Sequence, residues 1–266
     1  MREVRGWWFG TLDKKLGYND NRDIVVGKTH KIIGKIKPCE YGLHLSKRIL
    51  DALYYAPGPV IYQVVGSGEV QSHGHPIDKY ACSERTYIAG GIDISDVLCK
   101  FARMCASDVT YLWDAPPVVL DYLKSGNESL RVTTWDIAWE AALSAESDSR
   151  REAAYACKEC CPTFEQDGKE SFYRGVSGGW VHRLSSPYQT PWSSAKTAAI
   201  AAASAKKWEV TIKLRLRNGD TWDDNDTSLE IEHTTWETAR AAQNRRLTAM
   251  VKKALMKKEG SKWSIK

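Results

Sequence analysis

Extended and helical patterns of apolar residues alternate within the first ninety positions of the chain. Val60–Val65 is a run of β-branched and aromatic residues, and Lys79–Ile88 alternates apolar with polar positions, so both stretches predict β-strands. Residues 3–10 alternate more weakly and predict an opening strand. In Lys47–Tyr55 the apolar positions recur with helical spacing. These patterns predict an α+β module over residues 1–93, with a small mixed or antiparallel sheet and one or two helices.

From Ile94 onward the spacing of the apolar residues becomes helical. Residues 94–160 therefore predict a helical region that follows the sheet module. The last helix of this region is expected to run from about Ser129 to Cys160. It carries Trp135 and Trp139 four positions apart, a spacing that predicts a packing ridge on one helix face.

Residues 161–233 predict a loop-rich insertion with a helix and a β-hairpin. Ser193–Ala205 is nearly all Ala and Ser, which favours a helix. Trp208–Arg217 alternates apolar with polar positions, and this period is typical of a half-buried strand, here with a basic outer face. Asn218-Gly219 is a hairpin turn signal, and Leu229–Glu232 would supply the returning strand.

Positive charge gathers at the two ends of the chain. The net charge is +5, yet residues 1–48 hold eleven Lys or Arg against five acids, and residues 245–266 hold eight against one. Residues 234–266 thus predict a basic C-terminal helix, and such clustering attracts anionic partners such as nucleic acid. The candidate contacts to nucleic acid or to a protein partner are Lys213, Arg215, Arg217, Arg245, Arg246, Lys252 and Lys253.

Neither a secretory signal nor a membrane span is expected. The N-terminal residues MREVRGWWFG lack an apolar run, and no stretch approaches about 18 uninterrupted apolar residues. The seven Cys are an odd number spread over helical patterns, which favours free thiols in a reducing compartment such as the cytoplasm. Cys157, Cys160, Cys161 and His182 lack the two paired spacings of a structural zinc site, so no metal is expected there.

Several segments resemble a family of uncharacterised bacteriophage proteins. The resemblance is carried by Lys37–Ser46, Asp51–Ala56, Val60–Val64 and the closing Ala239–Leu247. It covers residues 1–150 and 234–258 and does not extend to residues 160–233. It implies an accessory protein for host takeover or anti-defence, which would act in the host bacterial cytoplasm by binding a host protein or nucleic acid, and it implies no particular cofactor.

The order of elements in the first module is also similar to that of ADP-ribosyltransferases of the Arg-Ser-Glu class. The matching catalytic positions are Arg5, Ser46 and Glu84. In that class the guanidinium would hold the pyrophosphate of NAD, the hydroxyl would hold the nicotinamide ribose, and the carboxylate would stabilise the oxocarbenium-like charge. This resemblance implies NAD as cofactor, with His44, Tyr54 and Tyr87 as candidate cofactor-binding residues.

Each member of the trio also has a structural interpretation. Arg5 would pair with a surface acid, Ser46 would cap the following helix, and Glu84 would be an exposed charge on a strand. The Ser-Thr-Ser and Glu-x-Glu forms typical of the transferase class are absent around these residues. A rival trio of Arg174, Ser194 and the pair Glu230 and Glu232 has the Glu-x-Glu form but leaves only 20 residues between its Arg and its Ser. The binding hypothesis is therefore favoured over the enzyme hypothesis.

Overall fold

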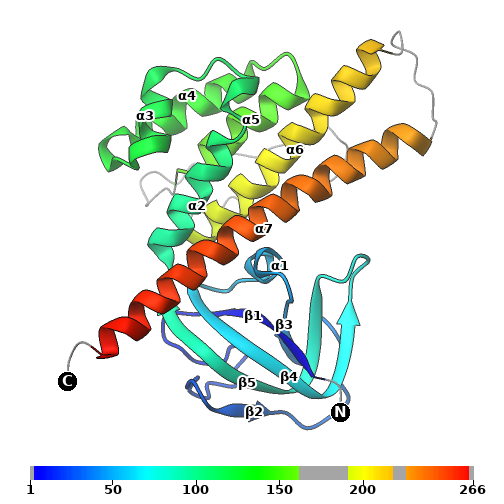
Figure 1. Cartoon of the computed structure of the whole chain (residues 1–266), viewed down its shortest axis with the longest axis vertical. Helices are drawn as coiled ribbons and strands as arrows, with labels where there is room; N and C mark the ends of the chain where they lie inside the picture. The colour runs from blue at the N-terminus through cyan, green and yellow to red at the C-terminus, as the bar shows by residue number, and fades with distance from the viewer. Residues whose placement is uncertain (1–2, 162–190, 218–225, 264–266) are drawn as a thin grey trace. The chain divides into compact units, whose positions relative to one another are not determined.

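The computed structural model describes residues 3–161, 191–217 and 226–263 (Figure 1). The chain divides into two compact units. The first consists of Met1–Leu98 together with Thr238–Lys266, and the second of Cys99–Glu237. Both ends of the chain thus belong to the same unit.

The first unit is built on a five-stranded antiparallel sheet, which confirms the α+β prediction. Its strands are β1 (Val4–Gly10), β2 (Thr29–Lys31), β3 (Leu43–Leu45), β4 (Val60–His73) and β5 (Lys79–Asp93). The strand order is β1-β4-β5-β2, and β3 also pairs with β5. The long hairpin of β4 and β5 therefore forms the centre of the sheet, and the shorter strands add to it.

The sheet curls until its first strand meets the residue that follows β3. Trp7 and Ser46 exchange two backbone hydrogen bonds, of 2.8 and 3.0 Å, while β3 itself pairs with Tyr80–Cys82 of β5. Two glycines make this closure possible. A Cβ atom on Gly6 would lie 2.8 Å from Leu45 Cδ1 and still closer to the Ser46 carbonyl oxygen, and one on Gly66 would lie 2.5 Å from Leu45 Cδ2.

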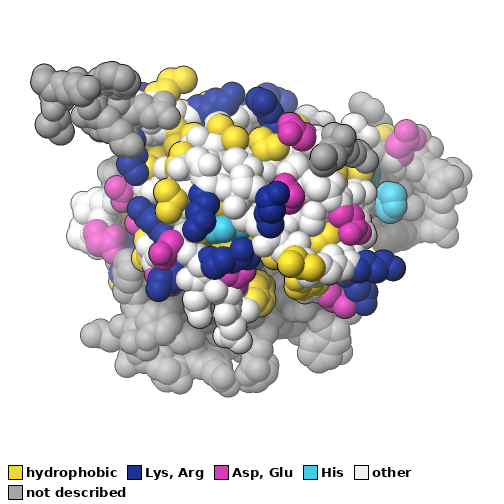
Figure 2. All heavy atoms as spheres, turned by 90° about the horizontal axis from the view of Figure 1, so that it is seen from below, with side chains coloured by type: hydrophobic (Ala, Val, Ile, Leu, Met, Phe, Trp, Pro, Cys, Tyr) yellow, Lys and Arg dark blue, Asp and Glu magenta, His cyan; other side chains and the backbone are white. Residues whose placement is uncertain are grey.

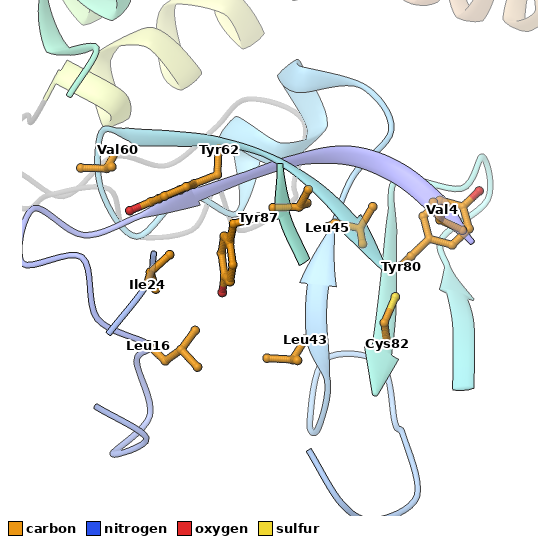
Figure 3. Close-up of a cluster of buried hydrophobic side chains, with 11 residues drawn as sticks. Val4, Leu16, Ile24, Leu43, Leu45, Val60, Tyr62, Tyr80, Cys82 and Tyr87 are labelled. Carbon is orange, nitrogen blue, oxygen red and sulfur yellow. The ribbon is translucent and has the colours of Figure 1, made fainter. Parts of the chain in front are cut away.

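The interior of the curled sheet holds a hydrophobic core cluster of the first unit. Its members come from the strands and from the segment that links β1 to β2, and they are Val4, Leu16, Ile24, Leu43, Leu45, Val60, Tyr62, Val64, Tyr80, Cys82 and Tyr87. Figure 3 shows Tyr62 and Tyr87 pointing from the strands toward the side on which Leu16 and Ile24 lie. Residues between β1 and β2 therefore cover one end of this core.

Two helices complete the first unit. The short helix α1 (Ile49–Tyr54) follows β3, and the long helix α7 (Asp226–Trp263) brings the C-terminal part of the chain back to it. The backbone N–H of Leu50 donates to Asn244 Oδ1 at 3.1 Å, and Lys258 Nζ donates to the carbonyl of Gly91 at 3.3 Å. Buried α7 side chains lie at a spacing of four: Gln243, Leu247, Val251 and Leu255.

The second unit is helical. Its described elements include α2 (Ser95–Ser107), α3 (Pro117–Ser125), α4 (Arg131–Leu143), α5 (Asp148–Glu159) and α6 (Pro191–Arg217), of which α2 begins in the first unit. The most extensive packing is between α5 and α6, where small residues such as Ala153, Ala154, Ala198 and Ala202 are fully or almost fully buried. No helix within the described residues is both long enough and apolar enough to cross a membrane.

The predicted β-hairpin of residues 208–232 is wrong. Trp208–Arg217 is the last part of α6, and Leu229–Glu232 lies in α7, while the predicted turn at residues 218–219 is outside the described residues. No Gly or Pro interrupts the chain between the Ala-rich segment and Arg217, so the helix continues through the alternating stretch. Hydrogen bonds of helical spacing support it, from Thr211 Oγ1 to the Lys207 carbonyl and from Lys213 to Glu209.

The single helix expected over residues 129–160 is two helices in the structure. α4 ends at Leu143, and Ser147 begins α5 by accepting a hydrogen bond from the backbone N–H of Arg150 at 3.3 Å. A serine at this position satisfies an N–H group that has no partner within the helix, which favours a new helix start. The ridge of Trp135 and Trp139 is confirmed, with the two rings stacked at 5.7 Å.

Substitution of the closure glycines tests the curled sheet. Gly6→Ala should lower the free energy of unfolding by about 1–3 kcal/mol, because the added methyl group forces the backbone at Ser46 to move. Gly17→Ala is the matched control, since a methyl group added there would meet no atom within 4 Å beyond the adjoining residues, and it should change stability by less than about 0.5 kcal/mol. Urea unfolding followed by tryptophan fluorescence measures both, and equal stability of the two variants would contradict the closure.

Candidate functional site

The three transferase-like residues lie at different places around the curled sheet. Arg5 is exposed on β1 and pairs in register with Val65 of β4. Ser46 is 2% exposed and is held to Trp7 by backbone hydrogen bonds. Its neighbour Leu45 pairs with Tyr80, four residues from Glu84, which is roughly 14 Å along an antiparallel strand. Among the described residues, no hydrogen bond or ion pair joins two members of this trio.

Glu84 is engaged with side chains outside the trio. Its carboxylate lies 2.9 Å from Lys31 Nζ and accepts a hydrogen bond from Ser67 Oγ at 3.4 Å. The hydrogen bond from Lys31 is the main reason why the pKa of Glu84 is lowered. Glu84 is therefore a charged carboxylate in a surface ion pair between β5 and β2.

Two of the three candidate cofactor-binding residues come together and the third does not. Tyr87 is fully buried in the sheet. Its hydroxyl and the backbone carbonyl of His44 both accept hydrogen bonds from one buried arginine side chain. Burial, and then the charges of Lys79 and Arg85, lower the pKa of His44 to about 4. Tyr54 is 50% exposed on α1 and packs edge-on against the neighbouring Tyr55.

The guanidinium between His44 and Tyr87 belongs to Arg85, which the sequence reasoning missed. Arg85 is 2% exposed, and it donates from Nη1 to the His44 carbonyl at 2.6 Å and from Nη2 to the Tyr87 hydroxyl at 2.7 Å. Its Nε also lies 3.2 Å from that hydroxyl, and its plane lies over the Trp8 ring at 4.0 Å. Because Arg85 is two positions from Tyr87, it shares the same face of β5, and this spacing could have marked it.

Aromatic rings surround Arg85 on the inside of the sheet. The Tyr62 and Tyr87 rings lie 5.4 Å apart, the Trp8 ring lies 5.6 Å from Tyr62, and the His30 ring lies 5.3 Å from Tyr87. We call Arg85, Tyr87, Tyr62, His30 and Trp8 the Arg85 cluster. Burial shifts four pKa values away from the charged forms: it lowers those of Arg85 and His30, raises that of Tyr87, and raises that of Tyr62 to about 12.

The predicted basic residues of the C-terminal helix form a solvent-exposed surface on the first unit. Arg245, Lys252 and Lys253 are exposed, Arg246 is half-buried, and Lys257 extends the set by one turn. Together with exposed Ala249 and Met256, the exposed cations occupy the face of α7 opposite its buried residues. We call Arg245, Lys252, Lys253 and Lys257 the basic stripe.

The basic residues predicted on a strand face lie on a helix instead. Lys213 is exposed on α6 and pairs with Glu209 at 2.7 Å, one turn earlier. Arg215 and Arg217 belong to the same helix, but their side chains are outside the described residues. A basic strand face is therefore wrong, since helical spacing distributes these residues around the α6 axis.

The remaining candidates of the sequence lie in or near the second unit. Arg174 of the rival trio and His182 of the considered zinc site are outside the described residues, and Ser194 is fully buried in α6. Cys157, Cys160 and Cys161 are buried at the end of α5 without disulfides. Burial is the main reason why the pKa of Cys157 and of Cys160 lies above the usual range of a thiol.

Comparison of the chain with known proteins identifies no relative. A scan against protein-family models, a search of curated proteins and a search of solved structures each found no match.

The half-buried His44 predicts a dependence of stability on pH. Its folded pKa of about 4 lies below its ordinary value of 6.5, so between these values the unfolded chain binds more protons, and the free energy of unfolding falls as the pH is lowered. His44→Gln should reduce this slope by up to one proton, about 1.4 kcal/mol per pH unit. Denaturant unfolding from pH 7 to pH 4 measures it, with His233→Gln on the exposed face of α7 as control. A slope that is unchanged in His44→Gln would contradict the assignment.

Proposed function

We propose that the chain is a nucleic-acid-binding protein that contacts phosphate groups through the basic stripe of α7. The observation that carries the proposal is charge segregation along this helix. The 21 residues from Thr238 to Lys258 contain seven Lys or Arg and no Asp or Glu. Cations gathered without acids attract a polyanion, because each neutralised phosphate releases condensed counterions.

The arrangement of the stripe suits a phosphate backbone. Arg245 and Lys257 are twelve residues apart, which corresponds to about 18 Å along an α-helix. The opposite face of the helix is held in the first unit by its buried residues and by the hydrogen bond from Leu50 to Asn244. A rigid helix that presents its cations on one side loses little conformational entropy when it binds, which favours affinity.

Some described cations elsewhere in the first unit lie beside acids. Figure 2 shows a face on which basic side chains lie among acidic ones. In the strands, Lys31 is paired with Glu84, and between β1 and β2, Arg22 is paired with Asp20. Opposite charges side by side weaken the attraction for a polyanion, so the basic stripe is the better candidate.

The cellular context of the proposal comes from the sequence resemblance. As an accessory protein of a bacteriophage, the chain would act in the bacterial cytoplasm on nucleic acid, or on a host protein that presents acidic groups. The transferase alternative rests on the order of Arg5, Ser46 and Glu84 in the sequence, and the contacts of these residues add no support to it.

Salt dependence of binding tests the proposal. With four stripe cations on duplex phosphates, the logarithm of the binding constant should fall against the logarithm of salt concentration with a slope of about −3.6. The double variant Lys252→Gln/Lys253→Gln should weaken binding and reduce the slope by about 2 in magnitude, since two phosphate contacts are lost. Fluorescence anisotropy of labelled duplex and single-stranded probes at several salt concentrations measures both effects.

The matched control removes two lysines elsewhere in the first unit. Lys28→Gln/Lys35→Gln changes the net charge by the same amount, and both residues are exposed between β1 and β3. This control should keep the wild-type slope. Equal losses in the two double variants would show a general charge effect instead of the stripe. Unretarded probes at low salt would exclude nucleic acid and leave a protein as the partner.

A further inference from the structure

Arg85 is a buried cation that has no carboxylate beside it. In the part of the chain that the structure describes, its hydrogen bonds run only to the Tyr87 hydroxyl and to the His44 carbonyl. The acid that acts on it from a distance is Asp20, which already holds Arg22 by bonds of 2.6 and 2.7 Å. The ring faces of Trp8 and Tyr87 offset part of the charge. A buried guanidinium is ordinarily paired, so its environment is suited to an additional anion.

The hydrogen bonds around Tyr87 determine the tautomer of His30. The Tyr87 oxygen has two acceptor sites, and Arg85 Nε and Nη2 donate to both of them. His30 Nδ1 lies 3.2 Å from the same oxygen, so it can only accept the Tyr87 hydrogen. The hydrogen of the neutral imidazole is therefore on Nε2. This Nε2 is buried and makes at most a weak hydrogen bond, to the backbone of Asp23.

A second buried donor lies in the same cluster. The hydroxyl of Tyr62 has no hydrogen-bond partner, and the residue is only 1% exposed. Tyr62 is close enough for Tyr87 and Arg85 to act on it electrostatically. Leaving a buried donor without an acceptor costs about 1–3 kcal/mol. A hydroxyl without an acceptor and a weakly bonded imidazole N–H, in the cluster of a cation without a carboxylate, indicate that this part of the interior has fewer acceptors than donors.

We propose that the Arg85 cluster binds a small oxyanion, a phosphate or carboxylate group, through Arg85, Tyr62 Oη and His30 Nε2. One anion would supply the missing negative charge and the missing acceptor oxygens together. The cations Arg22 and Lys28, which act on the neighbouring His30, add to the attraction. The site is separate from the basic stripe and does not depend on the proposed function.

The segment between β1 and β2 provides the route to this site. Leu16 and Ile24 of this segment belong to the same core, and the N–H of Gly27 donates to the Tyr87 carbonyl at 2.7 Å. Four non-glycine residues in the segment have left-handed backbone angles: Lys14, Tyr18, Asn19 and Asn21. Such a turn-rich segment opens at a lower free energy than the β4–β5 hairpin, so a small ion can enter while the sheet stays intact.

Titration of the full chain with inorganic phosphate and with formate tests the proposal at constant ionic strength, set with chloride. In protein labelled with ¹⁵N-histidine, the Nε2–H resonance of His30 should shift in a saturable manner, and the melting temperature should rise with anion concentration. A response to phosphate alone identifies a phosphate ligand, and a response to formate alone identifies a carboxylate. No saturable shift with either anion would overturn the proposal, because the donors would then be satisfied by ordered water only.

Removal of one donor locates the anion. Because substitution of Arg85 endangers folding, the informative variant is Tyr62→Phe, which keeps the ring and deletes the unpaired hydroxyl. It should weaken binding of the responding anion by about tenfold or more, since a hydrogen bond to a charged group is lost. Tyr111→Phe, on the exposed surface of the second unit, is the control and should bind as the wild type does. Equal affinities of wild type and Tyr62→Phe would place the anion elsewhere and refute the assignment.

Discussion

Closure of the curled sheet is the constraint on which the first unit depends. Only three residues form β3, yet its hydrogen bonds to β5 and the Trp7–Ser46 bridge after it bring the first strand next to the third. The strands then enclose a narrow interior, which requires glycine at positions 6 and 66 because backbone and side chains approach there. The same closure places the carbonyl of His44 where Arg85 reaches it from the neighbouring strand β5. The contacts that close the sheet therefore also hold the buried Arg85 side chain in place.

Local patterns predicted those parts of the fold that local interactions decide. The period of two in Lys79–Ile88 marks a real strand, because one face of β5 is buried against the core. The same period misleads in Trp208–Arg217, where an Ala-rich helix without a breaker continues through the alternating residues. The closure itself depends on register between segments almost forty residues apart. Such pairing leaves no periodic signal, so it could not be read from the chain.

The candidate site shows the same division. The exposed cations of α7 could be predicted from the sequence alone. Lys and Arg side chains are rarely buried, so they lie on the solvent-facing side of a helix whichever elements its other side packs against. The Arg85 cluster could not, because its meaning depends on which residues share the interior. Tyr87 was selected as an aromatic neighbour of a proposed trio, whereas its contacts are with Arg85 and His30. An arginine in a strand ordinarily indicates a solvent-facing position, and here burial reverses that expectation.

The two groups of cations attract anions by different physics. The basic stripe lies in water, where physiological salt screens charges beyond about 8 Å, so it suits a long polyanion that replaces many counterions at once. Arg85 lies in a medium of low dielectric constant, where screening is weak and an anion must shed its water to enter. A partner of the stripe would therefore be selected by its length and charge density, and a ligand of the interior by its size and hydrogen-bonding geometry. The two proposed sites share no residue, so binding of a macromolecule to the stripe and of a small anion within the sheet can be tested separately.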